Sequence, residues 1–305
     1  MKICIVAGAR PNFIKVAPLI RAIDTAREAG HDIEASLVYT GSKNDMTVEP
    51  TLFDDLGIRK PDCYLDVTCA NLNELTGQVM SKFESYLQRK PADTVVVVDD
   101  LASTMAVAIV TKKQGVRLAH LAAGTRSFDI TMPKEINRLV IDGLSDILFT
   151  AGISNNSIAN REGAELSKVY MVGNILIDNV RYLHNKMHRP KLMDELQLED
   201  EEYLVFTLNR KALIAREDNL RLMLEAIEKR AGGMPVIAPL RGAARKAVEA
   251  CIALMDDEFT NLKIVDPMGY LDFSYLTAHA RGIITDSGNV AEEATFNQVA
   301  CITLN

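Results

Sequence analysis

The chain has 305 residues and a mass of 33.6 kDa, with 48% hydrophobic and 25% charged residues. Because domains usually hold roughly 100 to 200 residues, this length predicts two of them. The apolar content excludes an extensively disordered chain, which lacks the buried area needed to offset the entropy of ordering. A net charge of −7 and a pI near 5.4 disfavour nucleic acid as a partner.

The beginning of the chain predicts a cytoplasmic protein that does not contact membranes. Residues 1–7 form a short apolar run that is too short to span a bilayer and has no cleavage-site pattern. The five cysteines are scattered and odd in number, which favours neither a disulfide framework nor a zinc site. His184 and His188 lie four residues apart without further ligands nearby, so we expect no metal site there.

Strands and helices alternate through the first part of the chain. Residues 2–7 have the pattern of a buried strand, residues 8–12 interrupt it, and residues 13–29 have apolar side chains at helical spacing. Further strands are expected at Ile33–Tyr39, Thr94–Val98, Val116–Leu121, Ile147–Thr150 and Val169–Val172. This alternation predicts an α/β domain with a parallel sheet covered by helices on both faces.

The same pattern restarts after a charged stretch, residues 186–202, which contains Pro190. We therefore predict a Rossmann-like domain over residues 1–180 and a second over residues 181–305. Its strands are expected at Tyr203–Thr207, Pro235–Pro239, Leu262–Val265, Gly282–Thr285 and Ala300–Leu304, and its helices around Asp218–Lys229, Ala243–Met255 and Asn289–Phe296. Because a parallel strand normally leads into a covering helix, we expect the second domain to be truncated at its C-terminal end.

A turn after the first strand has the residues of a phosphate site. Residues 8–12 place backbone N–H groups and the guanidinium of Arg10 where a helix begins, and a helix N-terminus favours anions. An ordinary turn capped by Asn12 is the alternative.

A second turn, residues 285–289, repeats this pattern with Ser287 and Gly288. Glu293, further into the following helix, has a carboxylate that can accept hydrogen bonds from two ribose hydroxyls. The alternative for this acid is that it complements the helix dipole.

Two other places carry charged residues next to buried strands. Asp100 ends the central strand of the first domain, where open α/β sheets bind their ligands, although Asp100 or Ser103 can instead cap the next helix. Residues 120–138 contain two arginines, Arg126 and Arg138, and buried arginines need an anion or an internal carboxylate. The alternative there is an internal network of Arg138 with Glu135 or Asp142.

Five sequence motifs occur in a specific order: GARPNFIKVAPLI, the ASTMA that follows Asp100, RSFDITMPKEINR, VGNILID and TDSGNVAEEAT. Together they resemble the non-hydrolysing UDP-N-acetylglucosamine 2-epimerases over essentially the whole chain. The resemblance implies a GT-B fold, in which two Rossmann-like domains face each other across a cleft that holds UDP-GlcNAc. It also implies C2 inversion by elimination and re-addition of UDP without a cofactor, and a possible homodimer.

The resemblance assigns roles by position. Asp100 is implied to be an active-site acid, and Glu135 is the remaining acid of the motif PKE. Arg10 is implied to contact the diphosphate. Further substrate-binding positions are Arg126, Asn137, Arg138, Gly173, Asn174, Arg210, Ser287, Gly288 and Glu293. The last three are implied to hold phosphate and ribose.

Three positions depart from the family pattern where protons are handled. The family's glutamate before Ala-Gly is Ala122, its first glutamate after the motif proline is Lys134, and the histidine of its Thr-x-His-Arg motif is Asn209. Alanine cannot titrate, lysine reverses the charge, and asparagine does not exchange a proton at neutral pH. The catalytic set is therefore eroded.

Three functions fit this pattern. One is an active epimerase in which Asp100, Glu135 or a neighbour has taken over proton transfer. The second is a pseudoenzyme that binds UDP or a UDP-sugar, or that pairs with an active paralogue. The third is a GT-B glycosyltransferase, which the SFDITMPKEINR stretch disfavours.

Overall fold

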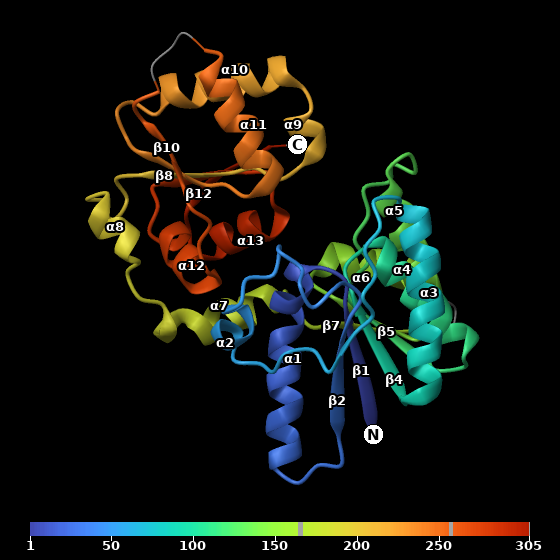
Figure 1. Ribbon diagram of the computed structural model, residues 1–305. Helices are drawn as coiled ribbons and strands as arrows, with labels where there is room; N and C mark the ends of the chain where they lie inside the picture. Colours follow the sequence, from blue (N-terminus) through green and yellow to red (C-terminus); the bar gives the residue numbers. More distant parts are fainter. Residues whose placement is uncertain (164–166, 256–258, 305) are drawn as a thin grey trace. The chain divides into compact units, whose positions relative to one another are not determined.

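The computed structural model describes residues 1–163, 167–255 and 259–304, and the chain divides into two compact units. The first unit runs from Met1 to Asn179 and the second begins at Val180 (Figure 1). Each unit is a parallel β-sheet flanked by helices, so the predicted α/β class with two Rossmann-like domains is confirmed.

The sheet of the first unit has the strand order β3-β2-β1-β4-β5-β6-β7. Its strands are β1 (Lys2–Ala7), β2 (Glu34–Tyr39), β3 (Cys63–Tyr64), β4 (Thr94–Val98), β5 (Arg117–Ala123), β6 (Ile147–Thr150) and β7 (Lys168–Met171). Its helices are α1 (Arg10–Glu28), α2 (Leu52–Leu56), α3 (Leu72–Arg89), α4 (Ala102–Lys113), α5 (Pro133–Leu144) and α6 (Ile153–Glu162), and α7 (Ile175–Leu183) crosses into the second unit. The sequence pattern located the longer strands within two residues, whereas β3 and α3 were missed.

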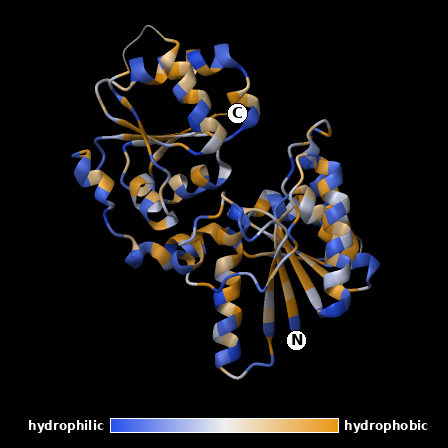
Figure 2. Cartoon of the chain, in the orientation of Figure 1, coloured by the Kyte–Doolittle hydropathy of each residue, from blue (hydrophilic) through white to orange (hydrophobic). Residues whose placement is uncertain are grey.

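Side chains of the central strands are buried on both faces of the first sheet. All five residues of β4 are buried, as expected for a strand with helices above and below it. On one face, Val95 and Val97 pack with residues of α3, α4 and α5; α1 covers the other face with an apolar stripe that includes Phe13 and Ile20 (Figure 1). Figure 2 shows this apolar strand layer and the hydrophilic residues on the outer helix surfaces.

The sheet of the second unit has the order β10-β9-β8-β11-β12. Its strands are β8 (Leu204–Thr207), β9 (Val236–Pro239), β10 (Leu262–Val265), β11 (Gly282–Thr285) and β12 (Ala300–Thr303). The helical segments are η1 (His184–Lys186), α8 (Lys191–Glu195), α9 (Lys211–Ile214), α10 (Glu217–Arg230), α11 (Gly242–Ala253), α12 (Tyr270–Ala278) and α13 (Gly288–Phe296). Helices α10 and α11 pack on one face of this sheet, and α12 and α13 on the other.

Each sheet has one point at which the order of strands reverses. It lies between β1 and β4 in the first unit and between β8 and β11 in the second. Loops at the carboxyl ends of such neighbouring strands diverge, and α/β proteins bind ligands in the resulting crevice. The four turns that follow these strands are therefore the places to look for a site in each unit.

All five cysteines are free thiols. Over the described ranges, no three side chains of His, Cys, Asp or Glu come together as metal ligands. No helix in this described part combines the length and apolar character that crossing a bilayer requires.

Candidate functional site

The turn after β1 is held by its own asparagine. The side-chain oxygen of Asn12 accepts hydrogen bonds from the backbone N–H groups of Gly8, at 2.8 Å, and Ala9, at 3.2 Å. These groups are therefore occupied, as the alternative of an ordinary turn held by Asn12 predicts. The Nε of Arg10 donates to Glu49 at 2.6 Å. To contact a diphosphate as predicted, the Arg10 guanidinium must either bind it in addition to Glu49 or leave Glu49.

The turn after β4 meets the β1 turn at the switch point. The Asp99 carboxylate accepts from Lys15 Nζ at 2.5 Å and from Asn12 Nδ2 at 2.8 Å. Its backbone has a left-handed conformation, with φ of 60°, which is uncommon for a residue with a side chain. Contacts from α1 and β5 thus hold a conformation that the local sequence does not favour.

Asp100 is held by three neighbouring residues of α5. Its carboxylate lies 2.7 Å from Arg138 Nη2 and 3.2 Å from Lys134 Nζ, and Asn137 Nδ2 donates to its backbone oxygen at 2.8 Å. The N-cap residue of α4 is Leu101, and no side chain caps this helix. The alternative of Asp100 or Ser103 as a helix cap is therefore wrong, because α5 supplies the partners of Asp100 instead.

Glu135 anchors the loop that precedes α5. Its buried carboxylate accepts from Ser127 N and Oγ, both at 2.9 Å, from Phe128 N at 3.1 Å and from Arg138 Nη1 at 3.0 Å. Burial alone acts to raise the pKa of Glu135, but these hydrogen bonds outweigh it and lower the pKa to about 2. The side chain is an ionised acceptor at neutral pH. Its predicted catalytic role stays a prediction, and the internal Arg138–Glu135 pair is present.

Arg126 points into the protein rather than to the surface. Only 1% of its side chain is exposed, and its guanidinium donates to Asp142 at 2.7 Å and to Glu162 at 2.9 Å. Its Nη2 atom has no hydrogen-bond partner among the described residues. The substrate-binding role of Arg126 therefore stays a prediction. In the structure, Arg126 links α5 to α6 through its ion pairs with Asp142 and Glu162.

The second unit also has an aspartate at its switch point, and this one is buried. Asp286, directly after β11, accepts from the backbone N–H groups of Asn209 at 2.7 Å and Arg210 at 2.5 Å, which follow β8. The side chains of Asn209 and Arg210 are exposed, while Asp286 itself is buried. A carboxylate thus fixes the backbone of this turn and leaves its two side chains directed outward, where a ligand can reach them.

Three predicted phosphate and ribose residues also lie at this edge. Ser287 is the N-cap of α13, and its hydroxyl accepts from Val290 N at 3.5 Å. Gly288 faces open space, because a Cβ placed there would meet nothing within 4 Å. Glu293 is buried and accepts from the Tyr270 hydroxyl at 3.0 Å. Glu293 lies beyond the first turn of α13, which weakens the alternative that it complements the helix dipole.

The structure thus brings Asp100, Glu135, Asn137 and Arg138 together. Another predicted substrate-binding residue, Asn174, lies just before α7, where its side-chain oxygen accepts a hydrogen bond from the Leu176 backbone N–H at 3.0 Å. Asp142 was named from the sequence as an alternative partner of Arg138, but it pairs with His120 and Arg126 instead. The contacts of Asp99 and Asp286 were not predicted, because they join residues far apart in the chain. His120, a polar residue inside an apolar strand, was the sequence signal for the contacts of Asp142.

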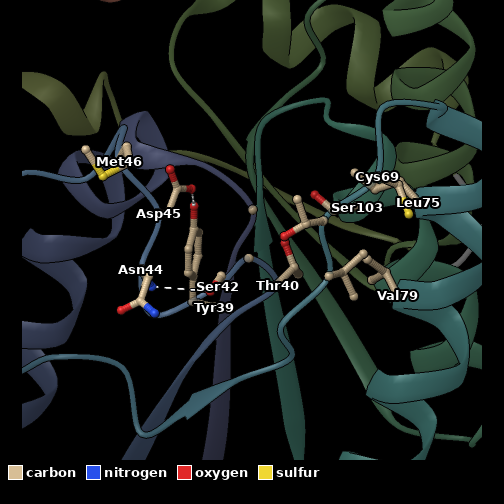
Figure 3. A pocket seen from close by; sticks show the side chains of 14 residues that line it. Tyr39, Thr40, Ser42, Asn44, Asp45, Met46, Cys69, Leu75, Val79 and Ser103 are labelled. Carbon is tan, nitrogen blue, oxygen red and sulfur yellow. Dashed lines mark hydrogen bonds between the residues drawn. The ribbon is translucent and has the colours of Figure 1, made fainter.

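A cavity of about 490 Å³ opens beside the first switch point. It is lined by Gly8, Ser103 and side chains that follow β2 and β3, and none of its lining residues is basic. Figure 3 shows the Tyr39 hydroxyl directed at the Asp45 carboxylate, and the two atoms are 2.5 Å apart. Burial, together with this hydrogen bond, raises the pKa of Tyr39, so the hydroxyl remains a donor. Without a cation, the cavity is suited to neutral polar groups rather than to a diphosphate.

Two Rossmann-like units, each with a polar turn at the switch point of its parallel sheet, place this chain in the α/β class whose members bind ligands at the carboxyl ends of their strands. Comparison with known proteins is more specific: residues 25–305 match the family UDP-N-acetylglucosamine 2-epimerase, and the chain belongs to this family.

Similar sequences and a similar solved structure agree with this family assignment. A UDP-N-acetylglucosamine 2-epimerase homolog of Methanococcus maripaludis is 33% identical over 308 residues, which is 100% of this chain and 84% of that protein. The UDP-2,3-diacetamido-2,3-dideoxy-D-glucuronate 2-epimerase of Pseudomonas aeruginosa is 31% identical, with 100% of this chain and 83% of that protein covered. The crystal structure of the Methanocaldococcus jannaschii UDP-GlcNAc 2-epimerase with UDP-GlcNAc and UDP has a TM-score of 0.85, 30% identity, and coverage of 100% of this chain and 84% of that one.

Proposed function

We propose that this protein binds UDP-N-acetylglucosamine or a closely related UDP-2-acetamido sugar, and that its C2 inversion is slow or lost. Binding follows from the family, whose solved members include complexes with UDP-GlcNAc and UDP. Slow inversion follows from the site, where proton carriers are scarce.

The proposal of slow inversion rests on the contacts of the two remaining carboxylates, those of Asp100 and Glu135. Asp100 forms ion pairs with Lys134 and Arg138, and Glu135 accepts four hydrogen bonds that lower its pKa to about 2. Removal of the C2 proton as the C1–O bond breaks needs a general base whose pKa lies near the pH of the reaction. Glu135 is therefore a weak base, and the Asp100 carboxylate is already engaged by two cations.

In this proposal, the nucleotide is held by Ser287, Gly288 and Glu293. Gly288 leaves open space for a phosphate at the start of α13, and the buried carboxylate of Glu293 is an acceptor for ribose hydroxyls. Arg10 and Arg210 supply positive charge for the diphosphate. A cytoplasmic homodimer that binds neither nucleic acid nor membranes remains our expectation, and light scattering coupled to size exclusion tests its oligomeric state.

The experiment combines calorimetric titration with UDP and UDP-GlcNAc and proton NMR of UDP-GlcNAc in D₂O with the protein present. We expect heat of binding and little or no deuterium at C2. Absence of binding to either ligand contradicts the proposal. Rapid deuteration at C2 would contradict only the second part of the proposal, that C2 inversion is slow or lost.

An active epimerase is the second candidate. It is favoured by the position of Asp100, whose side chain keeps 15% of its surface exposed next to Lys134, which is 58% exposed. A ligand can therefore reach this pair, and a carboxylate beside an amine can exchange protons with a substrate. Rapid C2 deuteration that disappears in Asp100→Asn would establish this candidate.

A further inference from the structure

His120 lies in β5 with 2% of its side chain exposed, and its two ring nitrogens face two different oxygen atoms. Nδ1 is 2.6 Å from a carboxylate oxygen of Asp142, and Nε2 is 3.0 Å from the backbone oxygen of Asp99. A backbone carbonyl has lone pairs and no hydrogen, so it can only accept. The Nε2 atom must therefore carry a proton to make this contact favourable.

The Asp142 carboxylate is also only an acceptor. Its other oxygen accepts from Arg126 Nη1 at 2.7 Å and from Gly124 N at 3.1 Å. Burial acts to raise the pKa of Asp142, but hydrogen bonds and charge from His120 and Arg126 lower it below its ordinary value. The Arg126 guanidinium and the Gly124 N–H hold Asp142 as an ionised acceptor without any contribution from His120, so Asp142 has no proton to donate and Nδ1 must carry one as well.

The surroundings balance a second positive charge. The Arg126 guanidinium and an imidazolium at His120 face the carboxylates of Asp142 and Glu162, so the four groups sum to zero. Buried charges persist when they are paired and hydrogen-bonded in this way. Two further ion pairs adjoin these groups: the 63% exposed Arg161 contacts Glu162 at 2.5 Å, and Lys15 contacts the Asp99 carboxylate at 2.5 Å.

We propose that His120 is a buried imidazolium ion and the positioning residue of the Asp99–Asp100 turn. Its Nε2–H holds the carbonyl of Asp99, whose left-handed backbone would otherwise relax by rotating this peptide plane. The orientation of Asp100, which follows directly, depends on that plane. A neutral ring would direct a lone pair at the carbonyl oxygen and release it.

The charge is tested on the wild-type protein by two-bond ¹H–¹⁵N correlation of its histidine rings at pH 7.5. His120→Gln identifies the His120 signals by their loss. We expect both ring nitrogens of His120 to have the chemical shifts of protonated nitrogens. If one of them has the shift of an unprotonated nitrogen, the proposal is wrong.

The positioning role is tested by hydrogen exchange of the Asp99 amide, which donates to the backbone oxygen of Leu121 at 3.3 Å. In His120→Leu we expect its exchange to accelerate by about 10- to 100-fold, the range for losing one hydrogen bond from a charged donor. His120→Gln retains an N–H donor and should restore exchange to within about 3-fold of wild type.

The Thr40 amide, which donates to Ala7 in the same unit at 3.0 Å, serves as the control. Its exchange should stay unchanged in both variants. Equal acceleration of Thr40 and Asp99, or no rescue by glutamine, would overturn the positioning role. None of these measurements uses a UDP-sugar, so their outcome is separate from that of the ligand-binding proposal.

Discussion

The ammonium group of Lys134 lies 3.2 Å from a carboxylate oxygen of Asp100. At this position, a family pattern with glutamate would place a second carboxylate near Asp100, and two neighbouring carboxylates raise the proton affinity of one of them. Here the lysine instead adds a second cation to that of Arg138 beside the Asp100 carboxylate. In the function we propose, this one substitution removes a proton carrier and leaves the remaining acid engaged by two cations.

Restoring the three proton-handling groups should restore chemistry. In Ala122→Glu/Lys134→Glu/Asn209→His, we expect deuterium incorporation at C2 of UDP-GlcNAc to rise at least about 10²-fold, the lower range for one acid–base group. The matched control carries glutamine at all three positions and should stay at the wild-type rate. Wild-type exchange as fast as that of the restored variant would show that the erosion has no catalytic cost.

Glu293 should contribute to nucleotide affinity. Because a hydrogen bond to a charged acceptor stabilises more than one between neutral groups, Glu293→Gln should weaken UDP binding by about 10- to 100-fold in calorimetry. Glu292 precedes it on α13 and is exposed, so Glu292→Gln is a control of identical chemistry that should leave affinity within about 2-fold. Equal effects of the two changes would remove Glu293 from the binding site.

Asp142 should be essential for the stability of the first unit. Asp142→Asn removes the carboxylate that His120 and Arg126 share, and breaking a buried charge network costs about 3–5 kcal/mol. Urea denaturation measures this loss. The exposed helical pair of Arg221 and Glu225 gives the comparison, since Glu225→Gln should cost less than about 0.5 kcal/mol. A loss below about 1 kcal/mol in Asp142→Asn would contradict a buried charge network.

Glu135 should make stability depend on acid. Its pKa is lowered from 4.5 to about 2 in the folded chain, so its contribution is fully present above pH 4.5 and is lost as the pH falls toward 2. The difference in free energy of unfolding between wild type and Glu135→Gln should therefore be constant from pH 7 to about 5 and shrink below pH 4.5. Denaturant titrations at several pH values measure it, and a constant difference down to pH 3 would refute this assignment.

The sequence patterns predicted most strands because the apolar runs of a parallel sheet are continuous and easy to delimit. The helix α3 was missed although its buried residues, Val79, Phe83 and Tyr86, recur at the helical spacing. That signal was available. The strand β3 has only two residues, Cys63 and Tyr64, and such a short pairing leaves no periodicity to detect.

The candidate site was predictable by residue type but not by partner. The position of Asp100 after the central strand indicated the right edge of the sheet, since strand direction fixes where the carboxyl ends lie. Its pairing with Arg138, 38 residues further along, follows from how α5 packs beside α4. The inward orientation of Arg126 has the same origin, because Asp142 and Glu162 reach it from two different helices.

The central position of β1 has a consequence for the order of events during synthesis. β1 pairs with β4, and Lys15 and Asn12 reach Asp99 across 84 and 87 residues. As the N-terminus emerges from a ribosome, β1 can pair with β2 but must wait for β4 on its other side. Contacts of such long sequence separation form slowly. The nascent chain therefore carries an open strand edge until β4, Thr94–Val98, has been translated, which is the interval in which a chaperone would have most to protect.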